Sequence, residues 1–431
     1  MLVTRTASFT ALRMIIAHCA YKGYRIRQAD VSAAYLQSDL DDEVYVEQPP
    51  DSSVPARIRK KKVWKLNKAM YGLRKSPRYW YETVKKMMEQ FGLIQSDTDP
   101  CVFANSELIV GVWVDDFIFG GTPRMIQMFE KYLCDAFQCD LPHDVDHFCG
   151  LSIHQDMTEN TVRINQIDYI EQIMHDFDIK PRSVTKPILD YLPPGDGDKC
   201  ASDLRYKELL GALMFIMIGT RYDIAFAIHH LSRFSQNYQK IHYEALERVV
   251  QYLHQTKHQN ITYKMCINPV LVTYSDANWA GCPHTRKSTS GRVVLYGNSP
   301  VAWSSQLQKV TATSSCESEI YALTDAVKET LYLRLLLEDL SSVQKTPSKV
   351  FCDNQAAVQI CSGRDQKLKR LRHLKGLKRF LDIRKRFIME HNPEVTIFHC
   401  ASDEMLADCM TKPFGPLKLR KAIQQISTAG S

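Results

Sequence analysis

The feature that most constrains this chain is the segment 110–121, which reads Val-Gly-Val-Trp-Val-Asp-Asp-Phe-Ile-Phe-Gly-Gly. Two adjacent acids, Asp115 and Asp116, stand between two short apolar runs, a pattern that predicts a β-hairpin. Buried carboxylates repel each other unless cations neutralise them. The hairpin therefore indicates a divalent-metal site with oxygen ligands. The alternative for an isolated Asp-Asp pair is a solvated turn, and the rest of the chain decides between the two.

Composition sets broad bounds on the protein. A chain of 431 residues with 45% apolar content should form two or three globular domains. It has no apolar run of membrane-spanning length and no signal-peptide pattern at its N-terminus, so no membrane partner is expected. Its 13 cysteines include no CxxC pair, which indicates reduced thiols in an intracellular protein rather than disulfides or zinc ligands.

Positive charge is concentrated in one block. The whole chain carries +7, whereas residues 364–386 hold eleven Lys/Arg against Asp365 and Asp382, a local excess of +9. Leucines recur there every three or four residues, which predicts a helix with one buried face and one cationic face. Such a face suits a polyanion, and the alternative is a solvated helix. The cations expected to bind nucleic acid are Lys367, Lys369, Arg370, Arg372, Lys375 and Lys378.

The segment upstream of the hairpin supplies a third acid and a basic, aromatic stretch. Residues 8–20 predict a helix that stops near Gly23, and residues 24–31 predict a strand that carries Asp30. Residues 43–48 predict a further strand, which ends at a Pro pair. In residues 63–80, Lys and Arg alternate with aromatic residues, a mixture that suits a nucleic-acid groove. For Trp80 alone, packing on a core is the favoured interpretation.

Three motifs in this order resemble the reverse transcriptase of copia-type LTR retrotransposons: Asp30-Val-Ser-Ala-Ala-Tyr-Leu, Tyr71-Gly-Leu-Arg-Lys-Ser-Pro-Arg-Tyr-Trp80 and Trp113-Val-Asp-Asp116. The resemblance implies a polymerase palm in which Asp30, Asp115 and Asp116 are catalytic and bind two Mg²⁺ or Mn²⁺ ions. It also implies substrate contacts. These would come from Tyr35 under the sugar, from the turn with Gly72, Ser76 and Pro77, and from Trp113.

Two departures from the family pattern stand out. Trp113 occupies a slot where the family usually has Tyr, and its bulk is expected to alter the fit of the primer or base pair. Met1 falls inside what resembles the middle of the fingers, and the basic segment that grips the triphosphate does not precede it. The expectation is therefore an N-terminally truncated fragment with partial fingers.

The C-terminal part contains a second set of acids. Asp276 follows a predicted strand, Glu319 lies in the first turn of a predicted helix, Asp353 ends another strand and Asp408 lies on a last helix. This is the order of an RNase H fold, and four carboxylates in one cleft again call for two Mg²⁺ or Mn²⁺ ions. The segments around 274–291 and 405–413 resemble copia-type RNase H, and the pattern around Glu319 favours it over Glu317.

The prediction is an α+β protein with four parts. Residues 1–150 form the reverse transcriptase palm and partial fingers. Residues 151–268 form a helical thumb and connection, with an exposed linker near 181–205. Residues 269–414 form an RNase H-like domain, and residues 415–431 a tail.

The function implied by the resemblance is RNA-directed DNA polymerase with RNase H activity. The partners would be an RNA template, a DNA primer, an RNA–DNA hybrid and deoxynucleoside triphosphates. The setting would be a cytoplasmic virus-like particle or the nucleus. The alternative is a catalytically dead relic that folds and binds nucleic acid only. An integrase of RNase H fold fits poorly, because it would need an Asp-Asp-Glu order.

Overall fold

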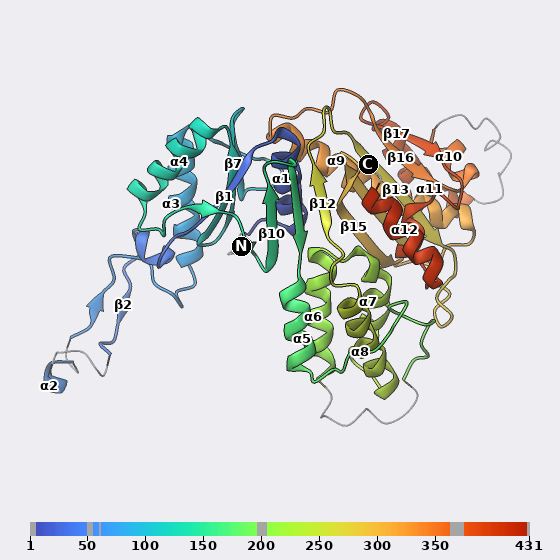
Figure 1. Cartoon of the computed structure of the whole chain (residues 1–431), viewed down its shortest axis with the longest axis horizontal. Helices are drawn as coiled ribbons and strands as arrows, with labels where there is room; N and C mark the ends of the chain where they lie inside the picture. The colour runs from blue at the N-terminus through green and yellow to red at the C-terminus, as the bar shows by residue number, and fades with distance from the viewer. Residues whose placement is uncertain (1–5, 50–54, 60–61, 196–204, 363–374, 429–431) are drawn as a thin grey trace. The chain divides into compact units, whose positions relative to one another are not determined.

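The structure is a computed structural model, and it describes residues 6–49, 55–59, 62–195, 205–362 and 375–428. The fold is α+β, as expected. The chain divides into two compact units, which are described separately: residues up to 15, 24–148 and 339–341 form the first, and residues 16–23, 149–338 and 342 onward the second (Figure 1). None of the described helices is both long enough and apolar enough to cross a membrane.

The first unit is built on a six-stranded sheet whose order is β4-β5-β6-β7-β1-β8. All the pairings recorded in it are antiparallel. The strands are β1 (Arg25–Asp30), β4 (Ile94–Gln95), β5 (Val102–Ala104), β6 (Leu108–Trp113), β7 (Asp116–Gly121) and β8 (His143–Asp144). Since β6 and β7 are buried over nearly their whole length, their near-continuous apolar sequence is what a sheet covered on both faces requires.

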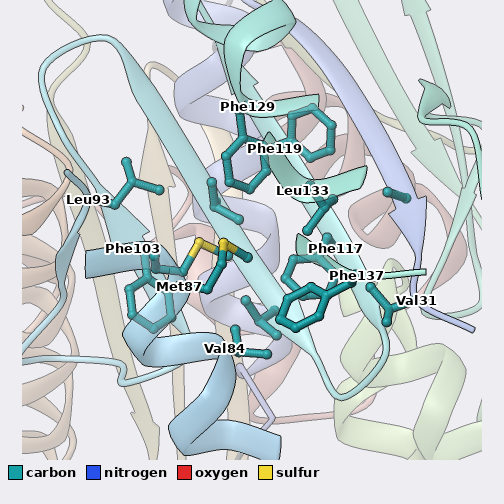
Figure 2. Close-up of a cluster of buried hydrophobic side chains, with 14 of the residues drawn as sticks. Val31, Val84, Met87, Leu93, Phe103, Phe117, Phe119, Phe129, Leu133 and Phe137 are labelled. Carbon is teal, nitrogen blue, oxygen red and sulfur yellow. The ribbon is translucent and has the colours of Figure 1, made fainter. Parts of the chain in front are cut away.

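Two amphipathic helices cover one face of this sheet, α3 (Ser76–Phe91) and α4 (Pro123–Ala136). Phe117 and Phe119 point toward the helices because alternate residues of a strand share a face. Figure 2 shows them in the buried cluster with Phe129 of α4. Trp80 is also a member of this cluster and is 2% exposed, as the core-packing interpretation expected.

The opposite face of the sheet meets the first half of α1 (Phe9–Lys22), which ends at Gly23. Gly111 of β6 is needed there, because a Cβ atom would lie 2.8 Å from the Ile15 side chain and 2.8 Å from that of Trp113. A short 3₁₀ helix, η1 (Ala34–Gln37), follows β1. The expected strand 43–48 is shorter than predicted. Only β2 (Tyr45–Val46) forms, pairing with β3 (Trp64–Lys65), and α2 (Ala56–Arg59) lies between them in sequence.

The second unit begins with antiparallel strands and helices in the region predicted as thumb and connection. β11 (Thr161–Asn165) pairs with β10 (Leu151–Asp156) and with β12 (Ile261–Lys264). The helices are α5 (Ile167–Asp176), α6 (Tyr206–Gly219), η2 (Tyr222–Ile224), α7 (Ala225–Ser232) and α8 (Lys240–Gln255).

The exposed linker expected near 181–205 is only partly correct. Val184 and Ile188 are 4% exposed, and the Tyr191 hydroxyl accepts a hydrogen bond of 2.9 Å from Asn278. The Val184 amide also donates to the side chain of Gln255 on α8 at 2.6 Å, so part of this stretch is bound to the helical region. Residues 196–204 lie outside the described residues.

The remainder of the second unit contains a five-stranded sheet with the order β15-β14-β13-β16-β17. The central strand β13 (Leu271–Asn278) is antiparallel to β14 (Thr289–Tyr296) and parallel to β16 (Ser348–Cys352). β15 (Ser299–Leu307) and β17 (Val395–His399) form the edges. Three antiparallel strands followed by two parallel ones confirm the expected RNase H-like arrangement.

Helix α9 (Ser315–Asp339) buries Ile320, Leu323, Ala326 and Val327 in a core shared with β16, β17, α10 (Gln355–Cys361) and α11 (Lys375–Glu390). The predicted helix around Asp408 is a short 3₁₀ helix, η4 (Leu406–Met410). Most of the segment named a tail is helical, since residues 416–428 form α12 (Pro416–Thr428). Leu419, Ala422 and Ile426 of α12 are buried, so this helix is part of the unit.

Candidate active sites

The predicted hairpin is present, and a side chain of helix α3 contacts its turn. β6 ends at Trp113 and β7 begins at Asp116, so Val114 and Asp115 form the connection. Val114 has φ 59°, a left-handed conformation that a β-branched residue adopts only when its surroundings enforce it. The Trp80 indole N–H donates to the Val114 carbonyl and fixes this turn. Trp80 thus has a second role beyond filling the core.

The strand β1 brings Asp30 to the same turn. Asp30 is the cross-strand partner of Asp116, and the Val31 amide donates to the Asp115 carbonyl at 2.9 Å. Asp30 is exposed, whereas Asp115 and Asp116 are half-buried, so the expected buried turn is correct only in part. The three acids predicted as the polymerase set therefore occupy one end of neighbouring strands.

Their charges act on one another. Burial, with the charges of Asp115 and Asp30, raises the pKa of Asp116 to about 6. Burial, with the charges of Asp115 and Asp140, also raises the pKa of Asp30. Within the described part of the chain, no ion pair with Lys, Arg or His neutralises any of the three. A set of hard oxygen donors that lacks a protein cation fits divalent ions such as Mg²⁺ or Mn²⁺.

Two tyrosines lie beside these acids. The ring of Tyr35 packs on that of Tyr71 with 4.6 Å between centroids. Burial and the nearby charge of Asp115 raise the pKa of both hydroxyl groups. Tyr35 therefore lies near Asp115, and its contact with a substrate stays a prediction.

Of the other expected substrate contacts, Gly72 and Pro77 stay predictions, whereas the side chains of Ser76 and Trp113 are buried. Gly72 is exposed at φ 93°, where only glycine is unstrained, and Pro77 lies in the first turn of α3. Ser76 is 1% exposed, and its hydroxyl donates to the Met70 carbonyl at 2.6 Å and accepts from the Met70 amide, so it holds the turn from inside. Trp113 is 9% exposed and packs on Phe148, so its side chain is a core residue rather than a primer contact.

The second set of acids gathers around α9. Glu319 accepts a hydrogen bond of 3.3 Å from the Ala277 amide of β13. Its other oxygen accepts from the Cys352 thiol at 3.7 Å. Ligand atoms of Glu319, Cys352 and Asp353 lie within 4.8 Å of one another, the one such group of three among the described residues. By the same criterion Asp30, Asp115 and Asp116 do not form such a group within the described part of the chain.

Asp276 and Asp408 complete this second site. Asp276 is 4% exposed and accepts a hydrogen bond from the Thr411 hydroxyl. Burial and the charges of Asp408 and Asp353 raise its pKa to about 7. Burial also raises the pKa of Glu319, with contributions from Asp276 and Asp353. Four acids, on β13, α9, η4 and the residue that follows β16, thus share one electrostatic environment.

A lysine stands among these carboxylates. The Lys412 ammonium lies 2.5 Å from Asp408 Oδ1. Burial by itself lowers its pKa, but the bond to Asp408 and the charges of Asp276 and Asp353 outweigh that effect and raise it. Lys412 therefore supplies one positive charge to a cluster of four acids, which leaves an excess of negative charge suited to divalent cations.

Several residues of this site escaped the sequence reasoning. Cys352, Thr411 and Lys412 touch the acids, and Ser402 donates to Asp353 Oδ2 at 2.8 Å. Burial and the charge of Glu319 raise the pKa of Cys352, which favours a neutral thiol that donates a hydrogen bond to Glu319. Cys352 adjoins Asp353, and Thr411 and Lys412 lie three and four residues after Asp408. This closeness in sequence to a predicted acid is the signal that could have found these three.

The basic block is described only at its end. Lys367, Lys369, Arg370 and Arg372 lie outside the described residues, and the side chains of Lys375 and Lys378 on α11 do too. Further along α11, the Arg384 guanidinium stacks on Tyr321 at 4.1 Å, and Arg386 pairs with Asp382 at 3.0 Å. The proposed contact with nucleic acid stays a prediction.

Comparison with known proteins shows what this chain is similar to. Residues 3–190 match the family described as reverse transcriptase (RNA-dependent DNA polymerase). The chain is also 30% identical over 420 residues to the retrovirus-related Pol polyprotein from transposon TNT 1-94 of Nicotiana tabacum. That alignment covers 94% of this chain and 31% of the relative. The chain is a relative of the copia-type Pol polyproteins.

Other copia-type relatives extend this relationship. The Pol polyprotein from transposon RE1 of Arabidopsis thaliana is 29% identical, over 94% of this chain and 27% of its own length. The chain thus spans less than a third of these curated relatives. Among solved structures, a foamy viral protease–reverse transcriptase in complex with RNA/DNA hybrid aligns with 92% of this chain and 46% of its own, at TM-score 0.48 and 14% identity.

Proposed function

We propose that this copia-type chain is an RNA-directed DNA polymerase that also cleaves the RNA of RNA–DNA hybrids. The observation that carries the polymerase half is the pairing of Asp30 with Asp116, next to Asp115, at the turn of a buried hairpin. The second acidic cluster carries the ribonuclease half. The substrates would be an RNA or DNA template, a DNA primer, deoxynucleoside triphosphates and the hybrid product. We expect the chain to work inside the cell, in a cytoplasmic particle or the nucleus.

At both sites the protein's contribution is to hold carboxylates in place. β1 and the hairpin fix Asp30, Asp115 and Asp116 against their mutual repulsion, so that two Mg²⁺ or Mn²⁺ ions could bind. Such ions, when bound, would activate the attacking hydroxyl or water and stabilise the leaving oxygen. Tyr35 lies beside the acids, where its ring would support the sugar of an incoming nucleotide.

In the second site, the four acids would bind two further divalent ions, and these ions would hold the scissile RNA phosphodiester. Cys352 donates to Glu319 and Ser402 donates to Asp353, and both bonds orient these carboxylates before substrate arrives. Thr411 does the same for Asp276. These neutral donors keep three carboxylates oriented without removing their negative charge.

The test is a pair of assays on one purified chain. Primer extension on poly-A template and cleavage of a labelled RNA–DNA hybrid are measured with Mg²⁺ or Mn²⁺. Asp115→Asn should abolish extension and spare cleavage, and Asp353→Asn should do the reverse. Glu107→Gln, at an exposed acid in the connection between β5 and β6 of the same unit, serves as the matched control and should change neither. Hybrid binding without either activity in the wild-type chain would replace this proposal with the relic that only binds nucleic acid.

A further inference from the structure

Two cysteines of the first unit lie in direct contact. Cys134 is exposed on the last turn of α4, and Cys139 is half-buried in the extended segment that follows. Their sulfur atoms are 2.9 Å apart. A disulfide requires about 2.05 Å between sulfurs, so a movement of roughly 1 Å would allow the bond.

The segment between the two cysteines is fixed by other contacts. Phe137 is 7% exposed and packs on Trp80, with ring centroids 4.9 Å apart, and Figure 2 shows it in the buried cluster near Phe117. The Gln138 amide donates to the Gln37 side chain at 2.8 Å, and the Gln138 carbonyl accepts from the Ser32 amide at 3.0 Å. The fold therefore brings the two thiols together without help from a covalent bond.

The same segment is hydrogen-bonded to the strand that carries a candidate catalytic acid. Cys139 forms an antiparallel bridge with Val31, and the Asp140 amide donates to the Asp30 carbonyl at 3.0 Å. A bond between Cys134 and Cys139 would attach the end of α4 directly to this bridge. Cys139 is thus paired with the residue that follows Asp30 in the chain.

We propose that Cys134 and Cys139 form a reversible dithiol–disulfide site that reacts with low-molecular-weight disulfides such as glutathione disulfide. Exposed Cys134 is the attacking group. Its thiolate attacks one sulfur of glutathione disulfide, the S–S bond of the reagent breaks, and one glutathione leaves as thiolate.

The half-buried Cys139 completes the exchange. Burial and the bond to Cys134 raise its pKa to about 12, so it remains protonated until the mixed disulfide forms. It then gives its proton to the departing glutathione and attacks Cys134 Sγ. The sum is two protein thiols oxidised to one disulfide and one glutathione disulfide reduced to two glutathione thiols.

The cross-link should reach the candidate polymerase site through the backbone. Joining α4 to the bridge at Val31 restrains the segment that accepts from Ser32 and donates to Asp30. These backbone hydrogen bonds would open less often. The amide hydrogens of Ser32 and Asp140 should therefore exchange with solvent about threefold more slowly in the oxidised chain.

The experiment treats the folded full-length chain with glutathione disulfide, alkylates the remaining thiols and maps disulfides by mass spectrometry without reduction. The expected product is a peptide with a Cys134–Cys139 disulfide, which dithiothreitol reduces. Amide hydrogen exchange, measured on the same oxidised chain, should be slower at Ser32 and Asp140. Cys139→Ser should stop at a stable glutathione adduct on Cys134. Cys266→Ser, at a half-buried cysteine of the second unit, is the matched control and should leave the cross-link unchanged.

Separate glutathione adducts on both residues of the wild-type chain, or two thiols still free, would overturn the proposal. A cross-link that forms without slower exchange at Ser32 and Asp140 would overturn its link to the Asp30 strand. These outcomes need only the wild-type chain, so they stand even if a variant fails to fold.

Discussion

Asp30 on β1 lies directly opposite Asp116 on β7 in an antiparallel pair, although like charges at such positions repel. The Val31 amide and the Trp80 indole, which donate to the Asp115 and Val114 carbonyls, hold the two strands in this register. Together with α3 and α4, these contacts stabilise the strands against the repulsion of the acids. Arrangements that cost stability in this way cluster at functional sites.

The stability lost to repulsion among these acids can be measured by substituting Asp116. Asp116→Asn should raise the free energy of unfolding of the first unit by about 1 kcal/mol at pH 7.5 without divalent ions, because it removes a carboxylate from two like charges and partial burial. Urea unfolding with EDTA present checks this. Glu107→Gln, an exposed acid in the same unit, should shift stability by less than about 0.5 kcal/mol. A loss of stability in Asp116→Asn would mean that the carboxylate is a structural partner.

Removal of the Lys412 charge should have the opposite effect on stability in the second site. Lys412→Met leaves Asp408, Asp276 and their neighbours without a cation, so it should destabilise the second unit by about 1 kcal/mol in EDTA. Added Mn²⁺ should then raise its melting temperature more than that of the wild-type chain. Thermal scans with and without Mn²⁺ measure both effects. Lys418→Met, at an exposed lysine on α12, should behave as wild type, and an equal Mn²⁺ response in Lys412→Met would contradict the assigned role.

Gly291 positions the element that carries Asp408. A Cβ atom at this residue of β14 would lie 2.6 Å from Thr411 Cγ2, 2.7 Å from Met410 Cβ and 2.9 Å from the Ala407 carbonyl oxygen. Gly291→Ala should therefore push η4 outward, lower hybrid cleavage at least about tenfold and cost 1 to 3 kcal/mol, roughly, in stability.

Gly211→Ala provides the control, because nothing lies within 4 Å of a Cβ atom at that helical glycine. It should stabilise the chain by about 0.5 to 1 kcal/mol and leave cleavage intact. Cleavage rates and urea midpoints for both variants give the comparison. Normal cleavage by Gly291→Ala would show that the packing of η4 on β14 does not position Asp408.

Buried histidines predict sensitivity to acid. Burial, with the charges of Arg233, His229, His284 and His242, lowers the pKa of His230 to about 3. The unfolded chain takes up this proton near pH 6.5 and the folded chain does not, so the stabilising contribution is complete above pH 6.5 and is lost as pH falls below it. The expected loss is about 1.4 kcal/mol per pH unit for this one group.

Urea unfolding between pH 7 and pH 5 tests this contribution by difference. His230→Gln should show a pH gradient smaller than that of wild type by about one proton, because Gln does not titrate. His175→Gln, whose side chain is 90% exposed, should keep the wild-type gradient. Identical gradients for all three chains would show that His230 is protonated in the folded state.

Local signals account for what the sequence predicted well. The hairpin and the order of the RNase H-like elements follow from short apolar runs bounded by glycines and acids, which act over a few residues. The packing of α12 had a comparable signal in Leu419, Ala422 and Ile426, at helical spacing, but its position after the last motif favoured a tail. The burial of Val184 and Ile188 was not predicted, because the prolines around them favoured an exposed linker.

What depends on tertiary contact could not be read from the sequence. The hydroxyl of Ser76 has both of its hydrogen bonds inside its own turn, and Trp113 packs on Phe148, 35 residues further along the chain. The contact of Cys352 with Glu319 and that of Thr411 with Asp276 join residues far apart in sequence. Only the folded chain decides which side chains of a motif face a substrate and which support it.

The most direct measurement is Mn²⁺ binding by electron paramagnetic resonance to the wild-type chain and two double variants. The account predicts that Asp115→Asn with Asp116→Asn removes the ions of the first cluster and keeps those of the second. Asp276→Asn with Asp353→Asn should do the opposite. Unchanged Mn²⁺ binding in both double variants would contradict the claim that these two carboxylate clusters are the metal sites of the protein.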